Sequence, residues 1–405
     1  MIRRKIIFTF FFAIVAYVVY GLFISQSDFR IIAPSLEVAD PPGFYDYRGV
    51  INVHSDASTG TGSVDDIIKS AQEADLDFLF LTDFNAFERD TSAEGYHNKL
   101  FVFIDGEYSY LDSRLLNLNA TTRDHLLGPG QSQALFADML SQKSRSAQRG
   151  FFVLAHPTID GFAWSGPYPP GLDGMEIVNL KSVWQDTWKH ARGSLLWSLL
   201  IYPFHSDLAV ARLFSRSGLN EIPIWDRLTK TRHMSGYLGS DAEQRIQSLG
   251  NDLKFPQYET IFRMAQNHIL LKSELTGNAA NDRAKIVQAI EKGQLYMSMD
   301  ILANPKGFNA VIKAKNENVY PIGSIVNFQK TMALVVRLPD KPVVPFEIVL
   351  FRNGERIASS KNPTWEHALE SPGTYRVEVR VRPLFPFPDN NLWVPWIFTN
   401  PFYVE

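Results

Sequence analysis

Short apolar runs alternate with stretches of helical periodicity from Tyr45 to about Asp300. Continuous apolar runs separated by helices are typical of parallel strands whose sheet is covered on both faces. Seven such runs in about 255 residues favour a closed barrel over an open sheet. The sequence therefore predicts an α/β barrel over residues 45–301, with strands at 49–53, 78–81, 100–104, 151–155, 175–178, 236–238 and 295–299.

The pattern changes after about Ala303, where strict alternation replaces the continuous runs. Residues 346–351 and 356–359 flank Asn353-Gly354, a pair that supplies the positive φ values of a type I′ hairpin turn. Residues 374–381 alternate apolar with charged positions, and 396–404 form a further candidate strand. Residues 302–405 are therefore expected to form a small all-β, sandwich-like domain.

The amino end carries a long apolar segment. Residues 6–24 are mostly apolar and span roughly 28 Å as a helix, close to the bilayer core of about 30 Å. Arg3, Arg4 and Lys5 precede them, which indicates a cytoplasmic amino terminus. We expect a retained membrane anchor over residues 1–25, a proline-containing stalk over 26–44, and an extracytoplasmic body. A cleaved signal peptide or a buried helix is the alternative.

An aromatic insertion interrupts the predicted barrel at residues 180–228. It carries Trp184, Trp188, Trp197 and Trp225 and an apolar run over 195–202. One interpretation is a helical lid packed on the barrel. The other is a face at the lipid interface, where tryptophan and tyrosine are favoured.

Composition narrows the chemistry. The 405 residues are 45% hydrophobic and 20% charged, as in a folded protein of more than one domain. A net charge of -3 provides no basic field for nucleic acid, so no nucleic-acid binding is expected. The absence of cysteine excludes disulfides, cysteine nucleophiles and thiolate zinc sites. His, Asp, Glu and Asn remain as metal ligands.

Candidate ligands follow several of the predicted strands. His54 opens a polar, glycine-rich loop after the first strand, and Asp83 ends the second. The carboxyl ends of barrel strands meet at one rim, so these side chains are expected to lie together. Imidazole and carboxylate ligands suit Zn, Mn or Fe. Later segments add candidates in similar settings, at Glu107, His125, His156, Asp241 and Glu243.

The order of these segments resembles the polymerase-and-histidinol-phosphatase (PHP) family of metal-dependent phosphoesterases. The segments are N-V-H-S-D, F-L-T-D-F, I-D-G-E, R-D-H-L, L-A-H-P and G-S-D-A-E, and the resemblance covers about residues 47–300. It implies a distorted (β/α)7, TIM-like barrel of PHP type with a metal cluster. Four motifs depart from the family pattern, at Asn52, at Ser58-Thr59-Gly60, at Phe84, which cannot bind metal, and at Glu243. We therefore expect one or two divalent transition-metal ions.

The resemblance also implies roles for single residues. The expected metal ligands are His54, Glu107, His125, His156 and Asp241, with Asn52 as an oxygen donor. Asp83 or Glu243 would accept a proton, and Arg245 and Lys181 would hold phosphate. Structural alternatives stay open: Asp83 orienting a histidine, a structural His125, Glu176 bracing the barrel rim, and solvated surface charge at Lys181 and Arg245.

The expected function is hydrolysis of a phosphate mono- or diester outside the cytoplasm by a membrane-anchored enzyme. A narrower version assigns phosphotyrosine or an envelope-polymer phosphate as the substrate. Another metal-dependent hydrolase is a further possibility. The alternative from a different class is a barrel that has lost catalysis and serves as a membrane or envelope binding module. The altered positions Asn52, Phe84 and Glu243 motivate that alternative.

Overall fold

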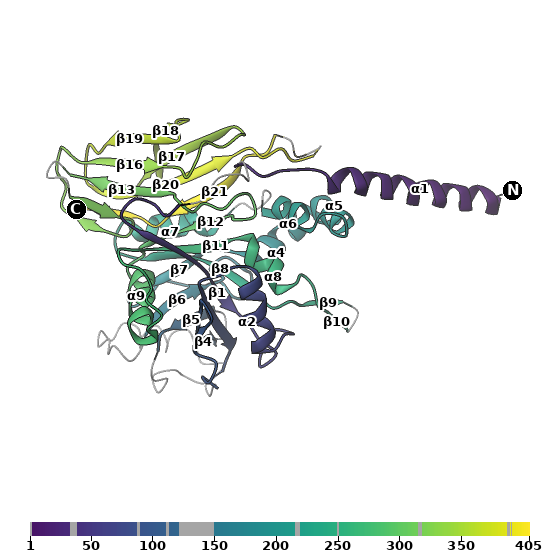
Figure 1. Cartoon of the computed structure of the whole chain (residues 1–405), viewed down its shortest axis with the longest axis horizontal. Coiled ribbons are helices and arrows are strands. Elements are labelled where there is room, and N and C mark those ends of the chain that lie inside the picture. Colours follow the sequence, from purple (N-terminus) through teal and green to yellow (C-terminus); the bar gives the residue numbers. More distant parts are fainter. Residues whose placement is uncertain are drawn as a thin grey trace.

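The computed structural model describes residues 2–32, 39–86, 90–110, 113–120, 150–214, 219–248, 251–314, 318–386, 389 and 391–405. A barrel with outer helices forms the centre of the molecule, and a strand-rich carboxyl region lies across one side of it (Figure 1). A long amino-terminal helix extends away from both. This arrangement confirms the predicted fold class: an α/β barrel, an all-β carboxyl region and an apolar first helix.

The barrel is a closed ring of seven strands. The ring closes because β1 pairs in parallel with both β2 and β8, with Val53 opposite Leu81 on one side and Ala242 on the other. β5 runs antiparallel to its two neighbours, and every other pairing in the ring is parallel. In ring order the strands are β1 (Tyr45–Val53), β2 (Phe78–Phe84), β4 (Leu100–Tyr110), β5 (Ser113–Leu118), β6 (Phe151–Ala155), β7 (Gly174–Asn179) and β8 (Ser235–Ala242).

The seventh barrel strand is not the one predicted. The apolar run at 295–299 forms β12 (Leu295–Ser298), which lies outside the ring and pairs with β11 (Gln266–Leu271) and β21 (Val394–Thr399). It is apolar because these neighbours keep all four of its residues buried. β5 takes its place in the ring. Its sequence, S-R-L-L-N-L, contains Arg and Asn, so it lacks the continuous apolar run by which buried strands are recognised.

Helices cover the outside of the barrel. α2 begins at a capping box in which Ser63 and Asp66 bond each other's backbone N–H groups, and it buries Ile67, Ile68 and Ala71. The segment predicted as an insertion forms four consecutive helices. The outer helices are α2 (Val64–Glu73), α4 (Leu180–His190), α5 (Arg192–Ile201), α6 (Ser206–Phe214), α7 (Glu221–Thr229), α8 (Tyr258–Met264) and α9 (Ala279–Glu291).

The carboxyl region contains two sheets. One continues from the barrel through β11, β12 and β21 into β20 (Gly373–Val381), β22 (Phe402–Val404), β15 (Ile325–Val326), β17 (Phe346–Arg352) and β18 (Glu355–Ser360). The other consists of β13 (Asn309–Lys313), β14 (Val319–Pro321), β16 (Ala333–Arg337) and β19 (Thr364–Ala368). Short strands elsewhere are β3 (Gly95–His97), β9 (Ile246–Ser248) and β10 (Asn251–Leu253).

The predicted hairpin is confirmed. Arg352 of β17 faces Glu355 of β18, and Asn353 and Gly354 between them have φ values of 53° and 78°. The apolar residues of β20 lie on a buried face, as its alternation predicts, and Arg376 and Glu378 on the other face are buried as well. The guanidinium of Arg376 donates to the carboxylate of Asp226 at 2.7 and 2.8 Å and so fixes the carboxyl region to α7.

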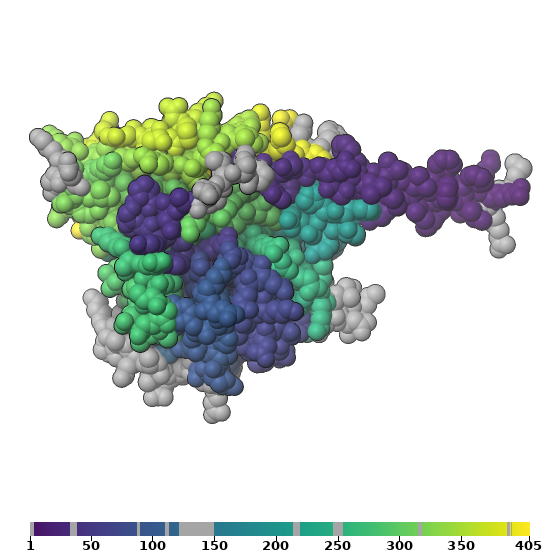
Figure 2. Space-filling model, viewed as in Figure 1, coloured from purple at the N-terminus to yellow at the C-terminus, as the bar shows by residue number. Residues whose placement is uncertain are grey.

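The first helix, α1 (Ile2–Ser25), contains a 22-residue segment in which an 18-residue window has a mean hydropathy of 2.4, and it is long and apolar enough to cross a bilayer. Figure 2 shows it standing free of the body over most of its length. Near its carboxyl end it contacts the insertion helices. Tyr17 donates to the carbonyl of Leu200 at 2.8 Å, and Trp197 donates to the hydroxyl of Tyr20 at 2.9 Å.

A buried histidine joins β11 to β1. The imidazole of His268 lies 2.9 Å from Asp46 Oδ1 through Nδ1 and 3.1 Å from Asp300 Oδ2 through Nε2. Tyr296 donates to the other oxygen of Asp46 at 2.5 Å. Burial opposes the charged imidazole, but Asp300 and Asp46 outweigh it and raise the pKa of His268 to about 9.

This pKa makes the stability of the fold depend on pH. A rise from 6.5 to about 9 corresponds to about 3 kcal/mol of stabilisation, fully present below about pH 6.5 and lost as pH rises through about 9. We expect the free energy of unfolding of the native protein to approach that of His268→Gln over this range. Denaturant unfolding followed by tryptophan fluorescence measures both. An unchanging difference between the two proteins would contradict the charged pair.

Candidate metal centre

Four side chains predicted as ligands meet at the carboxyl ends of the barrel strands. Nε2 of His54, directly after β1, lies 3.1 Å from Oε2 of Glu107 in β4 and 3.4 Å from Oδ1 of Asp241 in β8. Nε2 of His156, directly after β6, lies 3.7 Å and 3.5 Å from the other oxygens of the same two carboxylates. Two imidazoles thus face the same pair of acids.

This group is shut off from solvent and short of hydrogen bonds. The side chains of His54, Glu107, His156 and Asp241 are 1%, 4%, 3% and 1% exposed. Within the described part of the chain, His54 Nε2 and Asp241 Oδ2 have no hydrogen-bond partner despite their close approach to each other's groups. Buried polar atoms are normally hydrogen-bonded. Orphaned donors and acceptors that point at one another are the arrangement expected around a cation.

The electrostatics favour a cation as well. Burial opposes ionisation, yet His54 lowers the pKa of Glu107, and Lys181, His156 and His54 lower that of Asp241. In return, against the same burial, Asp241 and Glu107 raise the pKa of His54 to about 10. The two acids therefore stay ionised and attract positive charge. A divalent ion between imidazole and carboxylate ligands fits this donor set.

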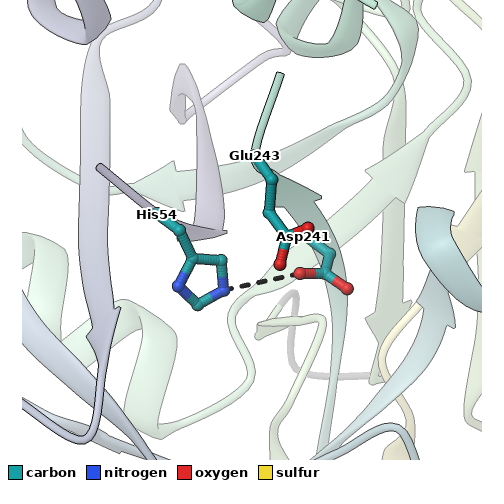
Figure 3. A group of neighbouring side chains, drawn as sticks. All are labelled: His54, Asp241 and Glu243. Carbon is teal, nitrogen blue, oxygen red and sulfur yellow. Dashed lines mark ion pairs between the residues drawn. The ribbon is translucent and has the colours of Figure 1, made fainter. Parts of the chain in front are cut away.

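Glu243 adds a third carboxylate at the edge of the group. Its oxygen, an imidazole nitrogen of His54 and an oxygen of Asp241 lie within 4.8 Å of one another, and Figure 3 shows the three side chains facing each other. Lys181, at the start of α4, also reaches this edge. Its Nζ lies 2.9 Å from Glu243 Oε1 and 3.5 Å from Asp241 Oδ2. The predicted substrate-binding lysine is thus paired with acids of the group.

The backbone around the site adopts a conformation that non-glycine residues rarely take. Asn52, His156 and Asp241 have φ values of 67°, 49° and 44°. Each such residue costs about 1–3 kcal/mol, and residues of this kind cluster at functional sites. The strain turns the chain sharply at three strand ends and aims His156 and Asp241 into the group.

Asp83 does not join the four side chains but fixes the loop that follows His54. Its carboxylate accepts hydrogen bonds from the N–H of Ser55 at 2.7 Å, the hydroxyl of Ser55 at 2.7 Å and the hydroxyl of Ser58 at 2.5 Å. These donors engage both oxygens. These contacts favour a supporting role over direct chemistry, although Asp83 braces the loop after His54 instead of orienting a histidine ring as the alternative expected.

Asn52 differs from its predicted role as a ligand. Its amide donates to Glu176 Oε1 at 2.8 Å and accepts from the hydroxyl of Thr82 at 3.3 Å. Glu176 also accepts from the N–H of His156 at 3.2 Å and from Asn179 at 2.8 Å. Glu176 is fully buried and requires donors, so it engages the amide and braces the barrel rim between three strands.

The structure adds an arginine that the sequence did not single out. The guanidinium of Arg114 in β5 lies over the ring of Phe84 at 3.9 Å and over that of Phe162 at 4.4 Å. The Phe162 ring is 5.9 Å from the ring of His156. Arg114 also projects from the same face of the sheet as Glu107, because Glu107 pairs with Leu116 two residues away. Phe84, which cannot bind metal, therefore supports a cation beside the group.

The remaining predicted residues lie at the periphery or outside the described part of the chain. Arg245 donates to the carbonyl of Thr59 at 3.2 Å, on the loop that follows His54. His125 lies outside the described residues. The signal that could have found Arg114 is weak, because β5 has no apolar run and the arginine follows no strand end.

Comparison with known proteins gives distant likenesses. Neither a protein-family model nor a curated protein matches the chain. Among solved structures, it is similar to a two-domain protein from Bacteroides vulgatus containing a predicted PHP-like metal-dependent phosphoesterase, with 13% identity, a TM-score of 0.40, and coverage of 91% of this chain and 98% of that one. It is also similar to PsfC from Pseudomonas syringae, with 11% identity, a TM-score of 0.36, and coverage of 64% and 93%. These identities and TM-scores are too low to carry an argument about function, so the chemistry is inferred from the side chains of the site.

The role of Asp83 can be measured directly. Asp83→Asn replaces an acceptor with a donor in front of the Ser55 and Ser58 groups, so the loop that carries His54 loosens. We expect the affinity for Mn²⁺ or Zn²⁺ to fall about 10- to 100-fold, as for other groups that orient a ligand. Competition with a chelator measures this, with the exposed Asp65→Asn as the matched control. Equal affinities of the two variants would refute the bracing role.

Proposed function

We propose that this protein is a membrane-anchored, metal-dependent phosphoesterase that hydrolyses a phosphate mono- or diester outside the cytoplasm. One observation carries the proposal: His54, Glu107, His156 and Asp241, from four separate strands, direct their polar atoms at a single buried point. Burying two ionised acids is costly, so stability alone does not explain why two acids and two imidazoles meet here.

The four side chains would hold Mn, Zn or Fe. A divalent ion bound there supplies Lewis acidity, which activates water and stabilises charge on phosphoryl oxygens. Asp83 and Glu176 keep the ligand-bearing loops in place. The protein's part in binding is therefore to pre-organise the ligands before any ion arrives.

In the reaction, a water oxygen bonds to phosphorus, the phosphorus–oxygen bond to the alcohol breaks, and the leaving alkoxide takes up the proton that the attacking water has lost. Glu243, less buried than the four ligands and at the edge of the group, accepts the proton of the attacking water. Lys181 lies beside the group, and Arg114 is close enough to interact electrostatically with Glu107, Asp241 and Glu243, so both neutralise the phosphoryl oxygens. We assign the proton-accepting role to Glu243 because the oxygens of Asp83 are taken by loop donors.

The membrane location rests on α1. Its 22-residue apolar segment stands free of the body, and Arg4 and Lys5 lie at its amino end. Basic residues favour the cytoplasmic side, so the barrel would face the other side of the membrane. The described contacts between α1 and α5 would hold the barrel close to the bilayer.

Metal content tests the proposal. The full-length protein, purified without a histidine tag, should contain one or two Mn, Zn or Fe ions per chain by elemental analysis and should hydrolyse a p-nitrophenyl phosphate mono- or diester. His156→Ala should lose most of the metal and at least about 100-fold in kcat/KM, because one ligand is gone. The exposed His190→Ala is the matched control. A metal-free protein that stays inert after Mn²⁺ or Zn²⁺ is added would refute the proposal and favour a binding module.

Glu243→Gln separates proton transfer from metal binding. The amide keeps the shape of the side chain but cannot accept a proton, so kcat should fall about 10²- to 10⁴-fold while the metal content stays unchanged. Glu355→Gln, on the exposed β17–β18 hairpin, is the control. Loss of metal together with activity would instead identify Glu243 as a ligand.

A further inference from the structure

A cavity of about 350 Å³ opens beside the metal group. Its walls come from α4, α5, α6, α8 and the segment after β8. Lys181, Asp241 and Glu243 contact one another and so form one charged end, and Arg245 also lines the cavity. The volume is in the range of small-molecule sites, about 300–1,000 Å³. The cavity therefore shares its charged end with the residues that we place around phosphate.

Away from this end the wall is apolar. The lining side chains belong to helices of the insertion and to α8, and the buried ones leave a space between them rather than filling it. The buried ones include Val183, Leu195, Val210, Leu213 and Ile261, and the half-buried Met264 lies among them. Protein interiors are normally packed without voids larger than a water molecule. An apolar space of this size next to a charged group suits a ligand with an apolar part and a polar head.

A polar group, the hydroxyl of Ser198, lies on the otherwise apolar part of the wall that α5 contributes. Ser198 lines the cavity and is 3% exposed, and its Oγ has no hydrogen-bond partner within the described part of the chain. A buried hydroxyl without a partner is uncommon.

The same helix that walls the cavity also contacts the membrane helix. Leu199 of α5 lines the cavity and is 40% exposed. Its neighbour Leu200 accepts a hydrogen bond from Tyr17 of α1. The rings of Tyr17 and Phe204 pack edge to face, 5.2 Å apart. In Figure 1, α5 and α6 lie at the base of α1, where the chain leaves the membrane segment.

We propose that the substrate is the phosphoester of an amphiphile, whose apolar chain occupies the cavity while its phosphoryl group lies at the His54–Asp241 group. This inference rests on the proposed phosphoesterase activity and names the class of its substrate. The bilayer around α1 supplies the amphiphile, and α5 is the wall it passes. A small water-soluble ester would use neither the apolar cavity nor the nearby membrane helix.

The length of the apolar chain should control the reaction. Each methylene moved from water into an apolar wall improves binding about fourfold, as long as the cavity has room. The inference thus requires kcat/KM to rise with chain length and then to level off. A site that binds only phosphate shows no such rise.

The test compares chain lengths in the full-length protein, held in an amphipol so that no detergent fills the cavity, with Mn²⁺ added. The substrates are propyl and decyl phosphate, each as the monoester and as the methyl diester, below the concentrations at which they form micelles. We expect kcat/KM for decyl to exceed that for propyl at least tenfold. Leu199→Trp, which fills the cavity, should reduce this ratio at least tenfold.

Leu196→Trp is the matched control, because Leu196 is on the same helix, is 56% exposed and does not line the cavity. Its decyl-to-propyl ratio should equal that of the native protein. A ratio is unaffected by the fraction of folded protein, so a partly unfolded variant cannot imitate the result. Cleavage of propyl esters without preference for decyl, or equal ratios in both variants, overturns the amphiphile and leaves the phosphoesterase standing. Cleavage of p-nitrophenyl phosphate esters but of neither alkyl chain length also overturns the amphiphile alone, whereas cleavage of none of these esters overturns the proposed function, and the amphiphile with it.

Discussion

The attraction between two buried acids and two imidazoles is the interaction on which the rest of this structure depends. Glu107 and Asp241 are almost without solvent, and each lies within 3.7 Å of both His54 and His156. Uncompensated, such charges would destabilise the barrel strongly. The two carboxylates can stay ionised there only if positive charge lies next to them, and the surrounding loops hold the positively charged groups in position.

Support for this group comes from residues that touch none of its central atoms. Asp83 fixes the loop after His54, and Glu176 joins Asn52, Asn179 and the backbone of His156 across the barrel rim. Three strand ends take left-handed backbone conformations to present their side chains. This strain opposes folding, and the closed ring of strands overcomes it. A rigid barrel thus stores unfavourable geometry at the one place where chemistry requires it.

The sequence predicted the barrel and the four converging side chains because each follows a continuous apolar run, a local signal that burial imposes. It missed β5 and its Arg114, because a strand with a charged residue facing the site loses that signal. It misplaced β12, because burial against the carboxyl region makes a strand as apolar as burial inside a barrel. The roles of Asn52 and Asp83 depend on partners more than twenty residues away, Glu176 and Ser55, which no local pattern reveals.

β1 belongs to two structures at once. Its first half, from Tyr45 to Gly49, pairs with β11, and its second half closes the barrel. One uninterrupted hydrogen-bonded sheet therefore runs from the ring into the carboxyl strands. The two parts cannot swing about a hinge, since any rotation between them would have to tear backbone pairs along this shared strand. Any force on the carboxyl region is therefore transmitted through β1 to the loop that carries His54.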